Sequence, residues 1–457
     1  MKMHRREWLR LSALGLLGAR AVGRGAAAAQ SGDPTRSQAP LTITGLRVTP
    51  IALPDPPLLF AGGCHGPYFL RNVIELETDG GIVGIGETKG GEAATGALER
   101  ARRVVVGRNA FAYRGFAREL LALSPACYLG VELACLDACG KATGRRLCEL
   151  LGGPVREPVE FAAYLFYRYA ADHPTVLADP HLVAGDRRGR GDRALDAWGE
   201  VRTPEAMAAM AEAFQRRFGF RVFKLKGGVL APDAERATLA AMAARLGSGT
   251  KLRIDPNGRW RVETAIRVGK TLGDLPLEYY EDPVRGQEEM AEVRRATGLK
   301  MSTNMCVTRF DDLPRALEVH PIDVLLCDLH YFGGFAGCLA LGPICDVAGW
   351  AMSQHSNNHA GPTMAAMIHA GATVPQLTLA SDTHYPWLVD DADIIEGPKL
   401  AIAGGRMEVP KGAGLGVALD RDKVARAHEV YEKCGMRGRD DAPLLRRLDP
   451  SWTGGLL

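Results

Sequence analysis

The 457-residue chain lacks the features of several large protein classes. It has no block of basic residues and no arginine stripe interleaved with aromatic residues, and its formal net charge is only +3, so nothing favours nucleic-acid binding. No apolar run is long enough to cross a bilayer. No G-x-G-x-x-G motif opens a helix after the first strand-like run, so a dinucleotide-binding fold lacks its main signal. The remaining composition, 46% hydrophobic and 24% charged, is typical of a globular protein.

The ten cysteines also lack a recognisable pattern. None shows the paired C-x-x-C spacing of a zinc site. Cys135 and Cys139 lie on an apolar helical pattern, where small buried thiols are common. We therefore expect reduced, buried thiols rather than a disulfide framework.

The first 29 residues are expected to form an export signal. Arg5 and Arg6 precede a short apolar stretch, Ala13–Ala19, and small residues follow at Ala27–Ala29. Paired arginines favour the twin-arginine route, so we predict a periplasmic protein with no membrane attachment after cleavage. The alternative is a basic tail without structure. Residues 30–40 are predicted to be a linker.

The rest of the chain divides into three predicted segments. Residues 41–157 hold two strand-like runs, a hairpin turn at Asp79-Gly80-Gly81 and then helical patterns, which predicts an α+β domain. Residues 158–410 alternate between strand and helix patterns, with about eight strands, which favours a closed α/β barrel over an open sheet. Residues 411–457 hold a turn and a helix and are predicted to pack on the first domain.

Polar residues end successive apolar runs of the predicted barrel. Neighbouring members of this series are about 23–30 residues apart, the length of one strand-helix unit. Because the strand ends of a barrel meet at one face, we expect these side chains to share one site. The series consists of Lys224 and Lys226, Asp255, Glu281, Asn304, Asp328 and His355.

Lys224 and Lys226 are two residues apart on a predicted strand, so both ammonium groups point to one face. Two close cations lower each other's pKa, and burial lowers it further, so we expect a lysine able to act as a general base near neutral pH. The alternative is an edge strand with solvated lysines.

Asp255, Glu281 and Asn304 offer oxygen ligands from three consecutive strand ends. Hard oxygen donors are suited to Mg²⁺, which keeps positions open for substrate oxygens. The alternative is that Asp255-Pro256 and Asp282-Pro283 simply begin turns.

His355 is the candidate acid or base on the other side of the predicted site. Asp328, one strand earlier, could accept the imidazole proton and so fix the tautomer and raise the basicity. Asn357 and Asn358 are either ordinary loop residues or donors to a substrate. His384 ends the eighth strand-like run and is a further candidate.

The motifs KLK, DPNG, EDP, TNM, a sixth-strand Asp and HSNNH, in this order, resemble the enolase superfamily and specifically its glucarate dehydratase group. The resemblance covers about residues 41–455 and implies an N-terminal capping domain, a (β/α)₇β TIM-like barrel and Mg²⁺, with Mn²⁺ as an alternative. It implies Lys226 as the base on one face with Lys224 assisting, and His355 paired with Asp328 on the other face. Residues that the resemblance implies as substrate contacts are His65, Tyr164, Lys224, Asn257, Asn357, His384 and Arg439.

The expected reaction is dehydration of a small acid sugar, a glucarate-like aldarate, to a 2-keto-3-deoxy acid by loss of an α-proton and the β-hydroxyl. Bases on two faces leave a racemase or epimerase open, as well as an aldonate dehydratase. An exported sugar-acid binding protein without turnover would be expected to have lost a base or a ligand, and all are present. The segment 120–131 is shorter than in typical members, so we expect an altered substrate range. Assembly into a homo-oligomer is left open.

Overall fold

The computed structural model describes residues 40–186 and 198–457. The predicted export signal and nearly all of the predicted linker lie outside the described residues, so both stay predictions. No helix in the described ranges is long and apolar enough to cross a membrane. All ten cysteines are free thiols, and nine of them are buried.

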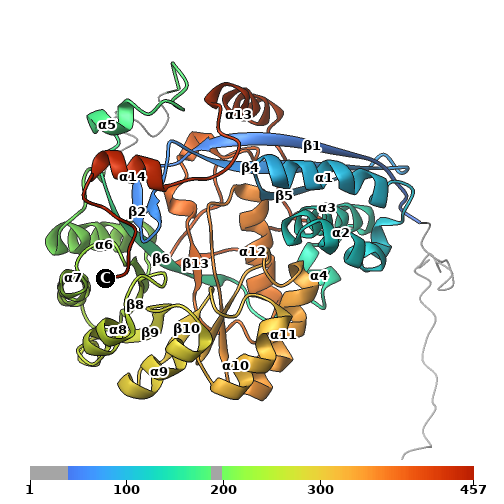
Figure 1. The fold of residues 1–457 in the computed structure, drawn as a ribbon. Helices are drawn as coiled ribbons and strands as arrows, with labels where there is room; N and C mark the ends of the chain where they lie inside the picture. Colours follow the sequence, from blue (N-terminus) through green and yellow to red (C-terminus); the bar gives the residue numbers. More distant parts are fainter. Residues whose placement is uncertain (1–39, 187–197) are drawn as a thin grey trace, which may run out of the picture. The chain divides into compact units, whose positions relative to one another are not determined.

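The N-terminal part is built on a three-stranded antiparallel sheet, in the order β1 (Ile43–Pro54), β4 (Tyr68–Thr78) and β5 (Val83–Lys89) (Figure 1). The turn between β4 and β5 lies at the predicted Asp79-Gly80-Gly81. Four helices follow, namely α1 (Glu92–Val105), α2 (Ala117–Leu123), α3 (Pro125–Thr143) and α4 (Leu147–Leu150).

Helix α3 is almost wholly buried, from Cys127 to Gly140. Its start is capped by the Ser124 side chain, which accepts from Cys127 N, and it ends at the left-handed Gly144. It can lie this close to β5 because the strand carries glycines: a Cβ on Gly84 would come within 2.0 Å of Ala134 O. The helix also contacts α11 of the barrel, so it connects the two parts of the molecule.

Eight parallel strands of the described residues form a closed barrel. The first seven pair in chain order, and the eighth pairs with the first. Between the seventh and eighth, Met352 bridges to Leu377, which lies just before the eighth strand. The strands are β6 (Val159–Arg168), β7 (Val222–Lys226), β8 (Lys251–Asp255), β9 (Leu277–Glu281), β10 (Met301–Thr303), β11 (Val324–Cys327), β12 (Ala351–Gln354) and β13 (Ser381–Thr383).

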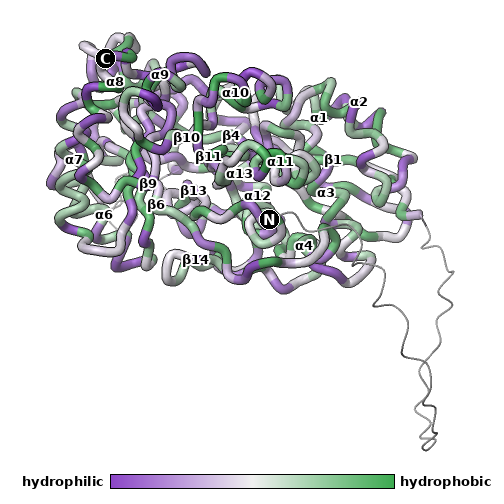
Figure 2. The backbone as a smooth tube through the Cα atoms, turned by 90° about the horizontal axis from the view of Figure 1, so that it is seen from below, coloured by the Kyte–Doolittle hydropathy of each residue, from purple (hydrophilic) through white to green (hydrophobic). Residues whose placement is uncertain are grey.

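Among the described residues, each crossover between successive strands holds one of seven longer helices, as in the predicted (β/α)₇β barrel, and the first crossover also holds the short α5. They are α6 (Pro204–Phe218), α7 (Pro232–Leu246), α8 (Val262–Gly269), α9 (Gln287–Thr297), α10 (Leu313–Val319), α11 (Gly334–Ala348) and α12 (Gly361–Thr373). Along α6, which buries one side and exposes the other, the colours alternate between hydrophobic and hydrophilic (Figure 2). Shorter elements are α5 (Pro174–Leu177), β14 (Arg406–Met407) and 3₁₀ helices at Ala110–Phe116, Phe310–Asp312, Tyr385–Trp387 and Asp390–Ala392.

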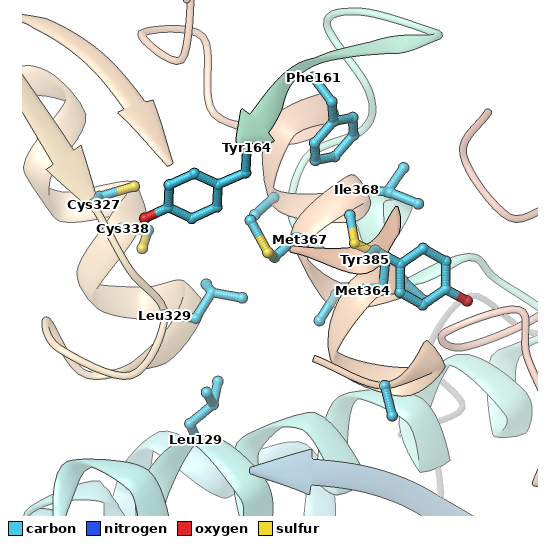
Figure 3. Packing of buried hydrophobic residues seen from close by; sticks show 14 of the residues in the cluster. Leu129, Phe161, Tyr164, Cys327, Leu329, Cys338, Met364, Met367, Ile368 and Tyr385 are labelled. Atoms are coloured by element: carbon cyan, nitrogen blue, oxygen red, sulfur yellow. The ribbon is translucent and has the colours of Figure 1, made fainter. Parts of the chain in front are cut away.

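All residues of α12 are buried, because this helix packs against both the barrel and the N-terminal sheet. Figure 3 shows its Met364, Met367 and Ile368 near Phe161 and Tyr164 of β6 and Leu329 after β11. The buried carboxylate of Glu87 on β5 accepts from Arg71 Nε at 2.6 Å and from the main-chain N–H groups of Ala360 and Thr363 at 3.0 and 2.9 Å. The sheet is thereby held to the loop that follows His355.

The mouth of the barrel is covered by segments from both chain ends. The hairpin of β2 (Leu58–Phe60) and β3 (Gly63–Cys64) pairs with β6. Helix α13 (Arg421–Cys434) packs on β1, and α14 (Ala442–Leu448) contacts β3. The last residue, Leu457, instead forms main-chain hydrogen bonds with Arg259 and Arg261 after β8. The predicted domain limits stay predictions.

Candidate active site

A cavity of about 530 Å³ opens at the carboxyl ends of the barrel strands. Its wall contains ten of the residues singled out from the sequence, namely His65, Tyr164, Lys226, Asn257, Asn304, His355, Asn357, Asn358, His384 and Arg439. The other four, Lys224, Asp255, Glu281 and Asp328, are buried immediately behind this wall. The structure therefore brings the whole predicted set to one place.

The two lysines lie on one face of β7, as predicted. Lys224 Nζ donates to Glu281 Oε1 at 2.5 Å and to Asp382 Oδ2 at 2.7 Å, and Lys226 Nζ donates to Asp255 Oδ2 at 2.5 Å. Both ammonium groups lie over the ring of Tyr164, at 4.8 and 5.3 Å from its centre. Both are buried side chains held by carboxylates, not solvated edge residues.

The expected lowering of the lysine pKa values is wrong for Lys224. Burial lowers the pKa of this group, but the charges of Asp382, Glu281 and Asp255 outweigh burial and raise it well above its usual value. These three carboxylates come from β8, β9 and β13, which the local K-x-K motif does not show. Lys224 is therefore an ammonium at neutral pH.

Asp255 ends β8, Glu281 ends β9 and Asn304 directly follows β10. Their three oxygen ligands therefore converge. Burial and then repulsion from Asp255 raise the pKa of Glu281, while Lys226 and Lys224 outweigh the effect of burial and bring the pKa of Asp255 to about 2. Glu281 Oε2 is buried without a hydrogen-bond partner in the described part of the chain. A cation at this point would satisfy that oxygen and relieve the repulsion.

The amide of Asn304 fits the same cation site. One of its two terminal atoms lies 3.1 Å from Asp282 Oδ2 and 3.2 Å from Glu281 Oε1, and the other lies 3.1 Å from His355 Nε2. With nitrogen toward the carboxylates, the amide donates to them, and its oxygen needs a proton on His355 Nε2 to complete the second hydrogen bond. With oxygen toward them, three oxygens face one another, which requires a cation between them. The residues present thus fit a hard divalent metal.

Asp282 does more than begin a turn. Its carboxylate accepts from Thr303 Oγ1 at 2.5 Å and from Asn304 N at 2.9 Å, and so fixes the segment that carries the third ligand. Burial, with the charge of Asp255 adding to it, raises the pKa of Asp282 to about 7. Its backbone has φ of 35°, a conformation that the surrounding contacts hold.

His355 and Asp328 form the predicted pair. His355 Nδ1 lies 2.8 Å from Asp328 Oδ2. The two partner histidines outweigh burial and hold the pKa of Asp328 well below its usual value, so the carboxylate is ionised and His355 carries its proton on Nδ1. Burial lowers the pKa of His355, so the ring is neutral at rest with Nε2 as an acceptor. Sequence reasoning missed His330, whose ring Nδ1 lies 2.8 Å from Asp328 Oδ1.

Neutral imidazoles form the part of the wall beside Tyr164, whose ring centre lies 6.2 Å from that of His384. The rings of His65 and His384 stack with centres 5.5 Å apart. Burial lowers the pKa of His65 well below its usual value, and burial, aided by neighbouring cations, lowers that of His384 to about 3. His384 Nε2 has no hydrogen-bond partner among the described residues and can serve a substrate hydroxyl, whereas His65 Nδ1 lies 3.4 Å from Asp55 Oδ1. Asp55, buried behind them, accepts from Asn358 Nδ2 at 3.0 Å.

Arg439 lies at the edge of this wall. Its Nε donates to Asp441 Oδ2 at 2.5 Å, its Nη1 donates to Asn358 Oδ1 at 3.2 Å, and its guanidinium lies 5.5 Å from the ring centre of Phe60. The charge that was expected to face a substrate is therefore already paired with Asp441.

Asp382 is the main site residue that the sequence reasoning missed. It is fully buried, accepts from Lys224 at 2.7 Å and lies 3.2 Å from Arg253 Nη1. Part of its signal was available: Asp382 is on β13, two residues before the predicted His384, and Arg253 is two residues before Asp255 and on the same face of β8.

Comparison with known proteins places this geometry in a family. Residues 206–423 match the family model described as Enolase C-terminal domain-like. A Streptomyces coelicolor protein named "Probable glucarate dehydratase" is 41% identical over 443 residues, which cover 90% of this chain and 97% of that protein.

Two solved structures have the same fold throughout. An enolase from Mycobacterium smegmatis, complexed with formate and acetate, is 38% identical with a TM-score of 0.83, covering 92% of this chain and 99% of that one. An enolase from Pseudomonas fluorescens, with bound magnesium, potassium and tartrate, is 37% identical with a TM-score of 0.83, covering 91% of this chain and 98% of that one. With the barrel, the capping domain and the series of strand-end residues all in place, the chain belongs to the enolase superfamily of enzymes.

Proposed function

We propose that the protein dehydrates an acid sugar, with a glucarate-like aldarate as the first candidate, to a 2-keto-3-deoxy acid in a Mg²⁺-dependent reaction. The observation that carries this proposal is one cavity with a lysine on one wall and a histidine–aspartate pair on the other, next to a cluster of oxygen ligands. The similarity to a protein named as a glucarate dehydratase supports the reaction class.

Asp255, Glu281 and Asn304 would hold the metal, and Mn²⁺ is the alternative to Mg²⁺. A bound divalent cation would offset the negative charge that develops on the substrate carboxylate when its α-proton leaves. The chain's own contribution to the same charge is Lys224, whose raised pKa keeps it an ammonium.

Lys226 and His355 would exchange protons with the substrate from two sides. Lys226 Nζ reaches the cavity wall and is fixed by Asp255 and by Asn257 Oδ1 at 2.8 Å. His355 presents Nε2, and the imidazolium that forms when it takes a proton is stabilised by Asp328.

The reaction balances without a redox partner. When the Cα–H bond breaks toward His355, Nε2 takes the proton, and when it breaks toward the other face, a neutral Lys226 takes the proton and His355 must enter the step as an imidazolium. The β-carbon–oxygen bond then breaks, and the leaving hydroxyl takes a proton from the His355 imidazolium and departs as water. The enol that remains gains a proton at the β-carbon and loses one from its hydroxyl, which gives the 2-keto-3-deoxy acid. Tyr164, Asn357, His65 and His384 line the same cavity and would orient the hydroxyl groups.

Screening acid sugars with Mg²⁺ tests this function. Semicarbazide traps the 2-keto product and gives it an ultraviolet absorbance. We expect trapping with at least one aldarate or aldonate, loss of activity on exhaustive chelation and recovery with Mg²⁺. Inversion at the α-carbon without any trapped product would show an epimerase instead. Binding without either reaction would show a sugar-acid binding protein.

We also propose that the protein is exported to the periplasm by the twin-arginine route, on the evidence of Arg5, Arg6 and the Ala-rich segment before Gln30. Cell fractionation with N-terminal sequencing tests this. Export that is unchanged by Arg5→Lys with Arg6→Lys, or uncleaved protein confined to the cytoplasm, contradicts it.

A further inference from the structure

Two arginines at the mouth of the cavity have no part in the chemistry described so far. Arg259 follows β8 and Arg285 follows β9, and both line the same cavity as Lys226 and His355. Within residues 40–186 and 198–457, neither guanidinium forms an ion pair with a carboxylate. The reacting end of the cavity pairs its cations with anions, whereas these two charges face the cavity unpaired.

Arg259 is a buried, ordered cation rather than a surface residue. Arg259 is only 7% exposed, and its Nε has no hydrogen-bond partner in the described structure. The guanidinium lies 5.5 Å from the ring centre of Trp452, which also lines the cavity. A buried charge without a partner is unfavourable, so this site is incomplete without an anion.

The end of the chain holds Arg259 in place. Leu457 N donates to Arg259 O at 2.8 Å, and Arg261 N donates to Leu457 O at 2.9 Å. In both Figure 1 and Figure 2 the C-terminus lies beside α8, which starts immediately after these residues. The segment from Trp452 to Leu457 therefore fixes the backbone of Arg259 and covers its side chain.

Arg285 lies against the same turn. Gly258 has φ of 66°, and a Cβ at this position would come within 2.5 Å of Arg285 Cγ, so the glycine leaves room for the arginine. Both arginines line one cavity, and burial and then the charge of Arg285 lower the pKa of Arg259. Paired guanidiniums bind carboxylate or phosphate oxygens through several charge-assisted hydrogen bonds.

We propose that Arg259 and Arg285 bind a second anionic group of the substrate, at the end opposite the reacting carboxylate. The group is the distal carboxylate of a dicarboxylic acid or the phosphate ester of a phosphorylated monoacid. Arg439 also lines the cavity, but its charge is already paired with Asp441, whereas Arg259 and Arg285 have no carboxylate partner among the described residues. The inference rests on the proposed function, since it assumes that an acid binds with one carboxylate at the metal ligands.

Unreactive ligands test the inference apart from catalysis. Adipate and hexanoate have the same length and differ only in the distal carboxylate, and neither has a β-hydroxyl to lose. Calorimetry on the full chain with Mg²⁺ should give adipate an affinity about 10- to 100-fold higher than hexanoate. A third ligand, hexanoate with a terminal phosphate ester, separates the two sources: tighter binding than adipate indicates a phosphorylated substrate.

Matched variants show which residues produce the preference for adipate over hexanoate. Arg259→Gln and Arg285→Gln should each bring the adipate-to-hexanoate ratio close to one, with hexanoate affinity unchanged. Arg261→Gln, an exposed arginine outside the cavity wall, should keep the wild-type ratio. Because Arg285 is exposed, its substitution does not threaten folding.

Three results would overturn the inference: no adipate preference in the wild type, a wild-type ratio in both Arg259→Gln and Arg285→Gln, or a ratio that collapses only in Arg439→Gln. Failure of the proposed function would look different, since the binding preference could then be intact while no acid sugar is turned over.

Discussion

The two ends of the cavity differ in how their charges are arranged. At the reacting end, Lys224 and Lys226 are each bound by buried carboxylates. At the mouth, Arg259 and Arg285 have no carboxylate partner in the described residues. The paired end has its geometry built in before substrate arrives, which suits a step that must stabilise developing charge. The unpaired end depends on the ligand for its charge balance, which suits discrimination between substrates.

The largest effect should come from the metal ligands at the paired end. Glu281→Gln removes a negative ligand from the cluster and leaves Lys224 with one carboxylate fewer, so we expect kcat/KM to fall by at least about 10³-fold, as when a group that stabilises transition-state charge is lost. Calorimetric Mg²⁺ titration should show weakened binding in the same variant. Glu292→Gln, at an exposed position on α9, serves as control. Full activity of Glu281→Gln would remove Glu281 from the metal site.

The second-largest loss of activity should come from substitution of Asp328, which holds the His355 ring in place. Asp328→Asn removes the anion that holds the Nδ1 proton, so Nε2 is no longer reliably the acceptor, and we expect kcat to fall by about 10²- to 10³-fold. Mg²⁺ affinity should be unchanged, since Asp328 is not among the metal ligands. The control is His320→Asn, because His320 is exposed and its φ of 53° is one that asparagine tolerates. Equal loss in both variants would indicate a general folding defect.

A smaller effect on catalysis should accompany Asp382→Asn. Lys224 and Arg253 both lose an ionised partner, so the unfolding free energy should fall by about 3–5 kcal/mol, as when one member of a buried ion pair is removed. We expect kcat to drop by about tenfold to a hundredfold, because Glu281 still holds Lys224. Urea unfolding and steady-state kinetics separate the two losses, and an unchanged stability would contradict the assigned role.

Part of the site could be predicted from the sequence alone, and part could not. The strand-end series from Lys226 to His355 follows the barrel period, so both its members and their convergence could be predicted. The lysine pKa could not, because Asp382 comes 158 residues after Lys224 and meets it only when the last strand closes the ring. Charge pairing across a barrel depends on which strands become neighbours, and a local motif does not contain that information.

The role of the two arginines at the mouth of the cavity was harder to predict, for a related reason. Arg259 and Arg285 are in irregular segments after β8 and β9, where arginines are ordinarily solvated, and no local pattern distinguishes them. Their significance comes from Trp452 and Leu457, nearly 200 residues later, which cover Arg259. By contrast, the hairpin at Asp79-Gly80-Gly81 needed only local turn chemistry.

The smallest predicted effect concerns stability away from the cavity wall. Glu235 is fully buried and accepts the N–H groups of Gly228, Val229 and Leu230, which follow Lys226. Burial outweighs these hydrogen bonds and raises its pKa to about 7. Between about pH 4.5 and 7 the unfolded chain has lost this proton and the folded chain retains it, so the group's contribution to unfolding free energy falls as pH rises, by up to about 3 kcal/mol in total.

Urea unfolding at pH 5 and pH 7.5 checks this. Glu235→Gln loses one hydrogen-bond acceptor at both pH values, but residue 235 then no longer titrates. The stability of this variant relative to wild type should therefore improve between pH 5 and pH 7.5. Glu205→Gln, at an exposed position in the first turn of α6, should show no such change. A relative stability of Glu235→Gln that worsens with pH would contradict the raised pKa.

The central claim is that Lys226 and His355 act on opposite faces of one α-carbon, and solvent deuterium exchange tests it most directly. With active acid sugars of both α-configurations in D₂O, proton NMR should show that His355→Asn still exchanges the α-proton of one epimer while dehydration is impaired. Lys226→Ala should lose exchange of that same epimer and keep exchange of the other. If both variants retain wild-type exchange with both epimers, proton transfer does not pass through these two residues and the account is wrong.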